Sequence, residues 1–232
     1  KLDEDESNSR LQFISGNIIT PELATIELQK ETAHFGKVTS KMNGFLEALI
    51  QEKDEKKRRK LQKKLAKYES ITDNMEVEIT AYITKLADRE ITSETSIRLR
   101  TYMNIANDLE RIGDIYFQMG KNIEVKNEKK IYFMPEQRQN LLEMIALVSE
   151  GFEEMVTNLQ VADYASVTKE KAREIEDRIN VKRNEMRTRN QDQLGEAGYP
   201  VEAAMTYNTI FSSLERVGDH LINVTESVVG EI

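Results

Sequence analysis

Residues 102–114 read YMNIANDLERIGD, and residues 207–219 read YNTIFSSLERVGD. The two stretches are identical at seven of thirteen positions and lie 105 residues apart. In both, polar and apolar side chains recur in steps of three and four, which is the spacing of a helix with one buried face. A self-match at this separation indicates a tandem repeat. We therefore predict two units of three helices each.

The helix boundaries follow from prolines and capping residues. Pro21, Pro135 and Pro200 each have an acid close behind them, a pattern typical of a first helical turn. Thr92 before Glu94 indicates another start, because a hydroxyl there can cap the helix. These signals predict helices over residues 21–52, 55–89, 93–125, 135–163, 165–193 and 200–229.

The predicted fold is all-α, with six long helices packed as one bundle of two repeats. Residues 1–19 are expected to form a linker, 20–130 the first repeat and 131–232 the second. Gly113 and Gly218 lie on the apolar rows of the repeated segments, which predicts close helix packing there. The second helix carries a heptad seam: Leu61, Leu65, Tyr68, Thr72, Met75, Ile79, Tyr82 and Leu86.

Composition excludes several classes of protein. The 232 residues include no Cys, so disulfide scaffolds and Cys nucleophiles are excluded. The longest apolar run spans about five residues, too few to cross a bilayer. Lys and Arg number 33 against 41 Asp and Glu, a net charge of −8 that argues against nucleic-acid binding. No phosphate-binding loop, dinucleotide motif or nucleophile elbow is present, so we expect no enzyme.

Residues 108–114 and 214–220 resemble the duplicated motif of the PhoU family, in which an acid, an Arg and an Asp follow one another along a helix. Residues 18–28 resemble the start of the cytosolic PhoU-like domain of bacterial sodium/phosphate cotransporters, and a chain that begins at Lys1 without Met suits such a fragment. The resemblance implies a regulatory or accessory domain in phosphate homeostasis. It also implies a membrane-embedded transporter partner at the cytoplasmic side of the bacterial inner membrane, and it is compatible with a homo-oligomer.

Members of this family carry multinuclear iron or zinc clusters, so the resemblance also implies iron or zinc. The expected metal ligands are Asp108, Asp114 and Asp219, with Glu69, Asp73 and Glu76 from the preceding helix. Arg111 and Arg216 are expected to offset the carboxylate repulsion or to hold an anion. The second copy departs from the pattern, because Ser212 and Ser213 replace the preceding acid and Asn180 aligns with Asp73. We therefore expect the first copy to be the better site.

Residues 53–67 contain nine basic and two acidic side chains. They are expected to form either a solvated helix face or a contact with an anionic membrane surface. The Glu-x-x-His match at residues 31–34 is attributed to chance, since a di-iron site needs two such motifs. Four functions remain open: the cotransporter domain, a free-standing PhoU-type adaptor in phosphate uptake and signalling, a carboxylate-bridged metalloprotein or metalloenzyme, and a purely structural bundle.

Overall fold

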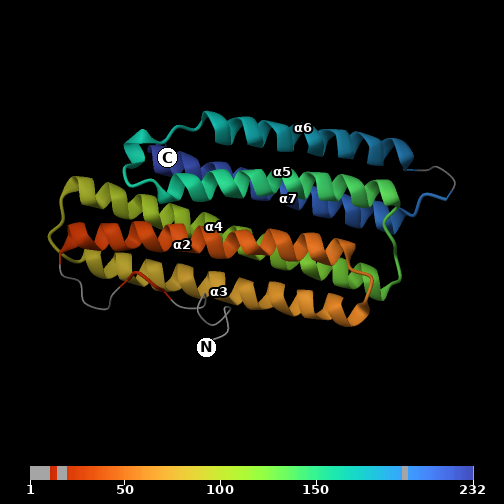
Figure 1. Cartoon of the computed structure of the whole chain (residues 1–232), viewed down its shortest axis with the longest axis horizontal. Helices are drawn as coiled ribbons and strands as arrows, with labels where there is room; N and C mark the ends of the chain where they lie inside the picture. Colours follow the sequence, from red (N-terminus) through yellow and green to blue (C-terminus); the bar gives the residue numbers. More distant parts are fainter. Residues whose placement is uncertain (1–10, 15–19, 195–197, 232) are drawn as a thin grey trace.

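The computed structural model describes residues 11–14, 20–194 and 198–231. Over those residues the chain forms six long helices and no strand, so the all-α prediction is confirmed. Figure 1 shows the helices side by side along the length of the molecule. Their bounds are α2 Pro21–Gln51, α3 Glu55–Ala87, α4 Ser93–Glu128, α5 Pro135–Gln160, α6 Glu170–Gln193 and α7 Val201–Val229.

The helices begin where capping side chains satisfy free backbone N–H groups. Thr20, Asp54 and Thr92 each accept a hydrogen bond from the N–H three residues on, at 3.3, 2.8 and 3.1 Å. Two of the three prolines occupy a first helical turn, as predicted. The third, Pro200, precedes its helix, which begins at Val201.

Three predicted helix boundaries are wrong: α4 continues past residue 125 to Glu128, and the two boundaries around residue 164 are displaced. The segment between the predicted helices 135–163 and 165–193 is longer than expected, because α5 ends at Gln160 and α6 begins only at Glu170. The carboxylate of Asp163 accepts the N–H of Ala165 at 3.0 Å and starts a separate short turn at Tyr164–Ser166. A local side-chain hydrogen bond thus competes with the continuing helix.

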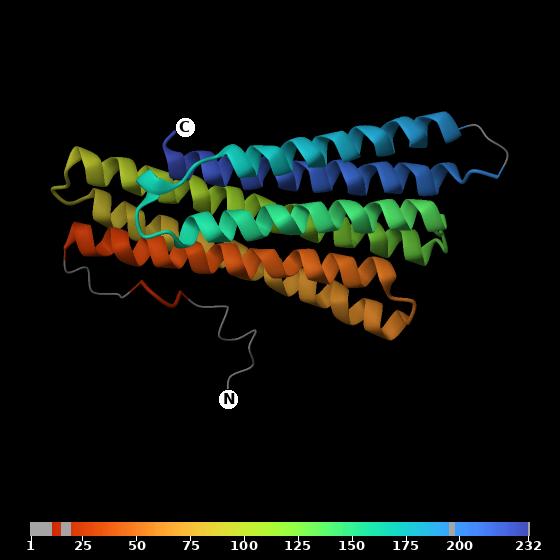
Figure 2. The same cartoon turned by 45° about the horizontal axis from the view of Figure 1, so that its top comes forward.

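The helices pack as two groups of three. Within the first group, α2, α3 and α4 contact one another, and within the second, α5, α6 and α7 do. Contacts of α4 with α7 and of α2 with α5 join the groups. Helices α3 and α6 therefore lie on the outside at opposite sides, at the bottom and top of Figure 1. In the turned view of Figure 2, α3 passes behind α2.

The predicted repeats each contain one of these groups. The range 20–130 holds α2 to α4, and the range 131–232 holds α5 to α7. The predicted linker 1–19 falls mostly on residues 1–10 and 15–19, which lie outside the described residues.

The buried interface between the groups contains a polar link. The hydroxyl of Tyr116 on α4 donates to Asn43 Oδ1 on α2 at 2.8 Å, and Asn43 Nδ2 donates to the carbonyl of Ile145 on α5 at 3.2 Å. All these groups are buried and paired, as buried polar groups need to be. The link fixes the register of three helices across the two groups.

The two motif glycines lie at close helix contacts. A Cβ added at Gly113 would lie 2.3 Å from Thr72 Oγ1 on α3, and one at Gly218 would lie 3.1 Å from Ile179 Cδ1 on α6. The predicted close packing is therefore present in both halves. Thr72 belongs to the predicted seam of α3, which is buried from Leu65 to Leu86.

We predict that Gly113→Ala lowers stability by about 1–2 kcal/mol, because the overlap with Thr72 outweighs the better helix propensity of Ala. Gly218→Ala is the matched control. It should cost less, since the nearest atoms there, Cδ1 and Cγ2 of Ile179, would lie at 3.1 and 3.3 Å from the added Cβ. Urea denaturation of both variants measures the difference. An unchanged midpoint for Gly113→Ala would contradict the close contact, and Thr72→Ala in the same chain should recover part of the loss.

Candidate functional site

Three carboxylates converge where α3 packs against α4. Glu69 and Asp73 on α3 and Asp114 on α4 each place a carboxylate oxygen within 4.8 Å of the others. Glu69 and Asp73 are half-buried and Asp114 is exposed. Asp114 directly follows Gly113, so the close helix contact described above brings the three groups together. We call Glu69, Asp73 and Asp114 the carboxylate cluster.

The carboxylate cluster concentrates negative charge. Burial raises the pKa of Asp73, and the nearby charges of Asp114 and Glu76 raise it further. Burial and the Asp73 charge likewise raise the pKa of Glu69. Asp73 Oδ1 is also buried with no hydrogen-bond partner. An unpaired buried oxygen beside like charges is costly, and a bound cation would relieve that cost.

Glu110 on α4 adjoins the cluster and was not among the expected ligands. Its pKa is raised to about 7, first by burial and then by the charges of Asp114 and Asp73. The signal for it was present in the sequence, since Glu110 lies one helical turn before Asp114 and thus on the same face. Its titration in the metal-free protein should fall near neutral pH.

The other expected first-copy residues are not among the three converging carboxylates. Glu76 Oε1 accepts a hydrogen bond from Thr80 at 2.8 Å. Asp108 is buried, and its Oδ1 lies 2.8 Å from Nδ1 of His220 on α7. Asp108 therefore links the two repeats. The side chain of Arg111 is exposed.

The matching positions of the second copy are Glu176, Asn180 and Arg183 on α6 and Glu215 and Asp219 on α7. This alignment is supported by the contact of α6 on Gly218, which repeats that of α3 on Gly113. The guanidinium of Arg183 lies 2.7 Å from Glu215, and Asn180 donates to Glu176. Since a fixed cation already stands among these acids, the second copy does not fit a metal ion.

Asp219 and Arg216 were both expected at the second site. There the acids are accompanied by basic side chains. Burial raises the pKa of Asp219, whereas the charges of His220, Arg183 and Arg216 lower it. The Arg216 side chain is exposed. The positive side chains around Asp219 leave less unbalanced charge than at the carboxylate cluster.

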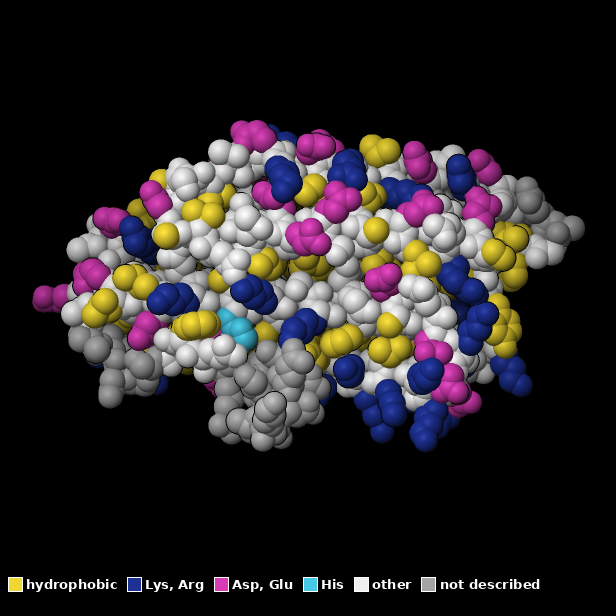
Figure 3. All heavy atoms as spheres, viewed as in Figure 1, with side chains coloured by type: hydrophobic (Ala, Val, Ile, Leu, Met, Phe, Trp, Pro, Cys, Tyr) yellow, Lys and Arg dark blue, Asp and Glu magenta, His cyan; other side chains and the backbone are white. Residues whose placement is uncertain are grey.

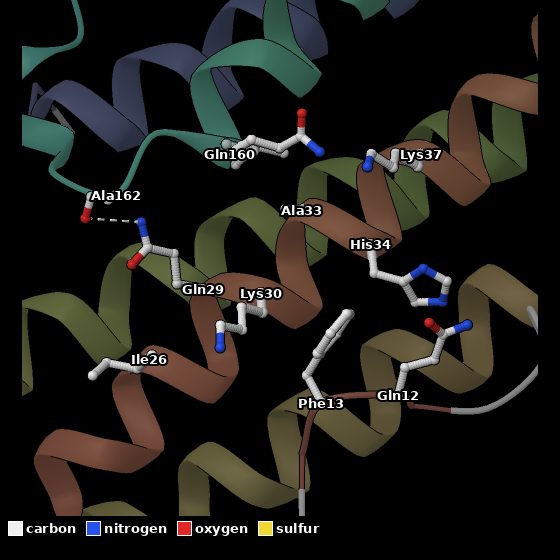
Figure 4. A pocket seen from close by; sticks show the side chains of 11 residues that line it. Gln12, Phe13, Ile26, Gln29, Lys30, Ala33, His34, Lys37, Gln160 and Ala162 are labelled. Atoms are coloured by element: carbon white, nitrogen blue, oxygen red, sulfur yellow. Dashed lines mark hydrogen bonds between the residues drawn. The ribbon is translucent and has the colours of Figure 1, made fainter.

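The Glu-x-x-His match has a structural explanation. Glu31 Oε2 accepts the backbone N–H groups of Gln12, Phe13 and Ile14 at 2.9, 2.7 and 3.3 Å, so it holds that segment on α2. His34 lines a cavity of about 580 Å³ beside the same segment (Figure 4). Within the described residues, Glu31 and His34 belong to no group of three side chains that could hold a metal ion.

Part of the chain is similar to a known protein family. Residues 34–123 match the family model described as the PhoU domain. Over these residues the chain is similar to the PhoU domain. This region contains most of α2, all of α3 and most of α4, and thus the whole carboxylate cluster and Glu110. The second copy of the motif lies outside the matched residues.

Two relatives show moderate similarity. One is an uncharacterised protein of Deinococcus radiodurans, 28% identical over 152 residues, covering 64% of this chain and 51% of that protein. The other is the phosphate-specific transport system accessory protein PhoU homolog 1 of Thermotoga maritima, 28% identical over 134 residues, covering 56% and 54%. The chain therefore spans about half the length of the curated relatives it matches.

A solved structure confirms the fold. The crystal structure of the phosphate transport system regulatory protein PhoU from Streptococcus pneumoniae superposes with a TM-score of 0.73. The match covers 90% of this chain and 95% of that one at 17% sequence identity. The PhoU fold thus extends over both groups of helices.

The basic stretch 53–67 covers the turn between α2 and α3 and the first part of α3. Figure 3 shows Lys and Arg side chains gathered at the lower right, over this end of the bundle. Most of these side chains are exposed. Separately, none of the helices in the described part of the chain is long and apolar enough to cross a membrane.

We predict that the metal-free protein loses stability as the pH rises from about 4.5 to about 7. The pKa of Glu110 is raised in the folded state, so folding is favoured while this group is protonated, and that advantage disappears through its folded pKa of about 7. Glu110→Gln should flatten this dependence and raise Tm at pH 7.5 by about 2–4 °C. Thermal unfolding with chelator at several pH values measures it.

The control variant is Glu128→Gln on the exposed end of the same helix. It should keep the wild-type pH dependence of Tm. If Glu110→Gln and Glu128→Gln behave alike, burial of the Glu110 carboxyl beside the cluster is refuted.

Proposed function

We propose that this chain is a PhoU-type regulatory or accessory protein of phosphate transport. The observation that carries the proposal is the similarity to the PhoU domain over residues 34–123. The fold shared with a phosphate transport system regulatory protein supports it. So does the similarity to an accessory protein of a phosphate-specific transport system. In this function the chain is not an enzyme and binds no nucleic acid. Its partner is a component of the phosphate transport system at the cytoplasmic side of the membrane.

Two forms of this function were expected from the sequence. The similarity to the Thermotoga accessory protein favours the free-standing adaptor over the cytosolic domain of a sodium/phosphate cotransporter. The resemblance of residues 18–28 to a cotransporter junction remains a prediction. Contact of residues 53–67 with an anionic membrane surface is likewise a prediction, supported by their exposure.

The proposed function is tested in the host. Deleting the coding sequence for this chain should change the rate of phosphate uptake or its response to phosphate supply, and reintroducing the wild-type sequence should restore both. Uptake of radioactive phosphate by cells grown in high and low phosphate measures the effect. If uptake is the same with and without the chain in both media, a regulatory function in phosphate transport is rejected.

We further propose that the carboxylate cluster holds a metal ion, iron or zinc. Its support is the convergence of Glu69, Asp73 and Asp114 and the unpartnered Asp73 oxygen. Glu110 stands beside them to complete the oxygen ligands. Such an all-carboxylate set suits iron better than zinc, which takes more nitrogen and sulfur ligands. The ion would supply the positive charge that Arg183 supplies in the second copy.

We predict that Asp73→Asn combined with Asp114→Asn abolishes metal binding, because it removes two of the three converging carboxylates. Asp219→Asn in the second copy is the matched control and should retain the metal. Elemental analysis after loading with Fe(II) or Zn(II) and desalting gives the metal content per chain. A wild-type protein that holds no metal after loading, or three proteins with equal content, would rule out the carboxylate cluster as the site.

A further inference from the structure

A cavity of about 400 Å³ lies at the end of the bundle where α2 turns into α3 and α4 leads into α5. Four basic side chains line it: Lys53, Arg58, Lys126 and Arg138. Its remaining wall is largely apolar and aromatic and includes Phe133. We call this cavity the end pocket. It shares no residue with the carboxylate cluster.

The four basic side chains come from four different parts of the chain. Lys53 lies in the turn after α2, Arg58 in the first turns of α3, Lys126 near the end of α4 and Arg138 in the first turn of α5. Arg58 and Arg138 are half-buried and Lys126 is buried. Their meeting is therefore a product of the fold, and only two of them belong to the basic stretch 53–67.

These cations are close enough to repel one another. Burial, and after it the charges of Arg58 and Arg138, lower the pKa of Lys126 to about 8. Lys126 Nζ is held in place by neutral groups. It donates to Asn127 Oδ1 at 2.8 Å and to the carbonyl of Ile131 at 2.9 Å, and it lies 4.6 Å from the centre of the Phe133 ring.

Three of these cations have no acid at ion-pair distance within the described residues. The ion pairs of that part of the chain include none with Arg58, Lys126 or Arg138. One carboxylate, that of Glu52, lines the end pocket, and its Oε1 accepts the backbone N–H groups of Lys53 and Asp54, both at 2.9 Å. The end pocket therefore combines buried positive charge with space for a ligand.

We propose that the end pocket binds a phosphoryl-bearing anion. A phosphoryl group carries up to two negative charges and presents several oxygens at once, which matches converging cations better than a single carboxylate does. Guanidinium groups bind such oxygens in pairs, and two of the cations here are Arg. The basic side chains of the end pocket would pair with the phosphoryl oxygens without any rearrangement of the helices.

The size and walls of the end pocket narrow the ligand class. The volume of about 400 Å³ exceeds that of one phosphate ion, so the ligand has further phosphoryl groups or an organic part. Tyr132, 68% exposed at the rim, and the buried Phe133 offer aromatic surface to an organic part. A soluble organic phosphate and a phospholipid headgroup share this chemistry. The proposal is independent of the metal site and of the function in phosphate transport.

The test compares wild type with Arg58→Gln/Arg138→Gln. Titration calorimetry of the full chain with inorganic phosphate and with ATP, and flotation with phosphatidylglycerol vesicles, probe the two sources. Losing both Arg side chains should weaken binding at least about tenfold, the loss expected from one charge-assisted hydrogen bond. The matched control is Lys85→Gln/Arg100→Gln, which removes the same charge from exposed positions on α3 and α4 outside both the end pocket and residues 53–67 and should bind like wild type.

Each outcome decides the proposal. Binding of ATP or phosphate that only the pocket variant loses supports it with a soluble ligand, and vesicle binding with the same pattern supports it with a lipid headgroup. Equal loss in the pocket and control variants would show general surface electrostatics and overturn it, as would wild type that binds none of the probes. Circular dichroism checks folding, and the single variants Arg58→Gln and Arg138→Gln replace the double variant if it does not fold.

Discussion

The contact between Thr72 and Gly113 is the constraint on which the rest of the first repeat depends. Because Gly113 has no side chain, α3 approaches α4 closely enough for Thr72 to lie over its backbone. That approach brings Glu69 and Asp73 against the face of α4 that carries Asp114 and Glu110. With a larger residue at position 113 the helices would separate and water would solvate each carboxylate. The packing of an apolar seam thus sets the electrostatics of the site.

The same backbone contact occurs in the second repeat with a different charge arrangement. Ile179 packs on Gly218 as Thr72 packs on Gly113. Around it the acids are accompanied by Arg183, which pairs with Glu215. The second repeat therefore pairs an acid with a basic side chain of its own, whereas no ion pair in the described part of the chain includes Glu69, Asp73 or Asp114. Duplication preserved the geometry while the chemistry of the two sites diverged.

Periodicity and helix-start signals predicted the helices, the buried seam and the close contacts at both glycines, because these follow from local sequence. The start of α6 could not be predicted in the same way, since the competing turn at Asp163 differs little from an ordinary helix cap. The carboxylates of Glu69, Asp73 and Asp114 were expected together from helical spacing and family resemblance. The pairing of Asp108 with His220 was not, because it depends on how α4 and α7 are aligned across the repeats. The end pocket was missed for the same reason, as four elements distant in sequence form it.

The outer position of α3 has a consequence for how the molecule opens. Helix α3 packs on α2 and α4 of its own repeat, whereas the contacts of α4 with α7 and of α2 with α5 hold the two repeats together. Local unfolding of α3 would therefore leave the joined helices in place, at a lower free energy than global unfolding. A cation held between α3 and α4 would raise the free energy of every opening that releases it, and this local step is one of them. Amide hydrogen exchange would then slow in α3, and occupancy of the site would make this outer helix more rigid.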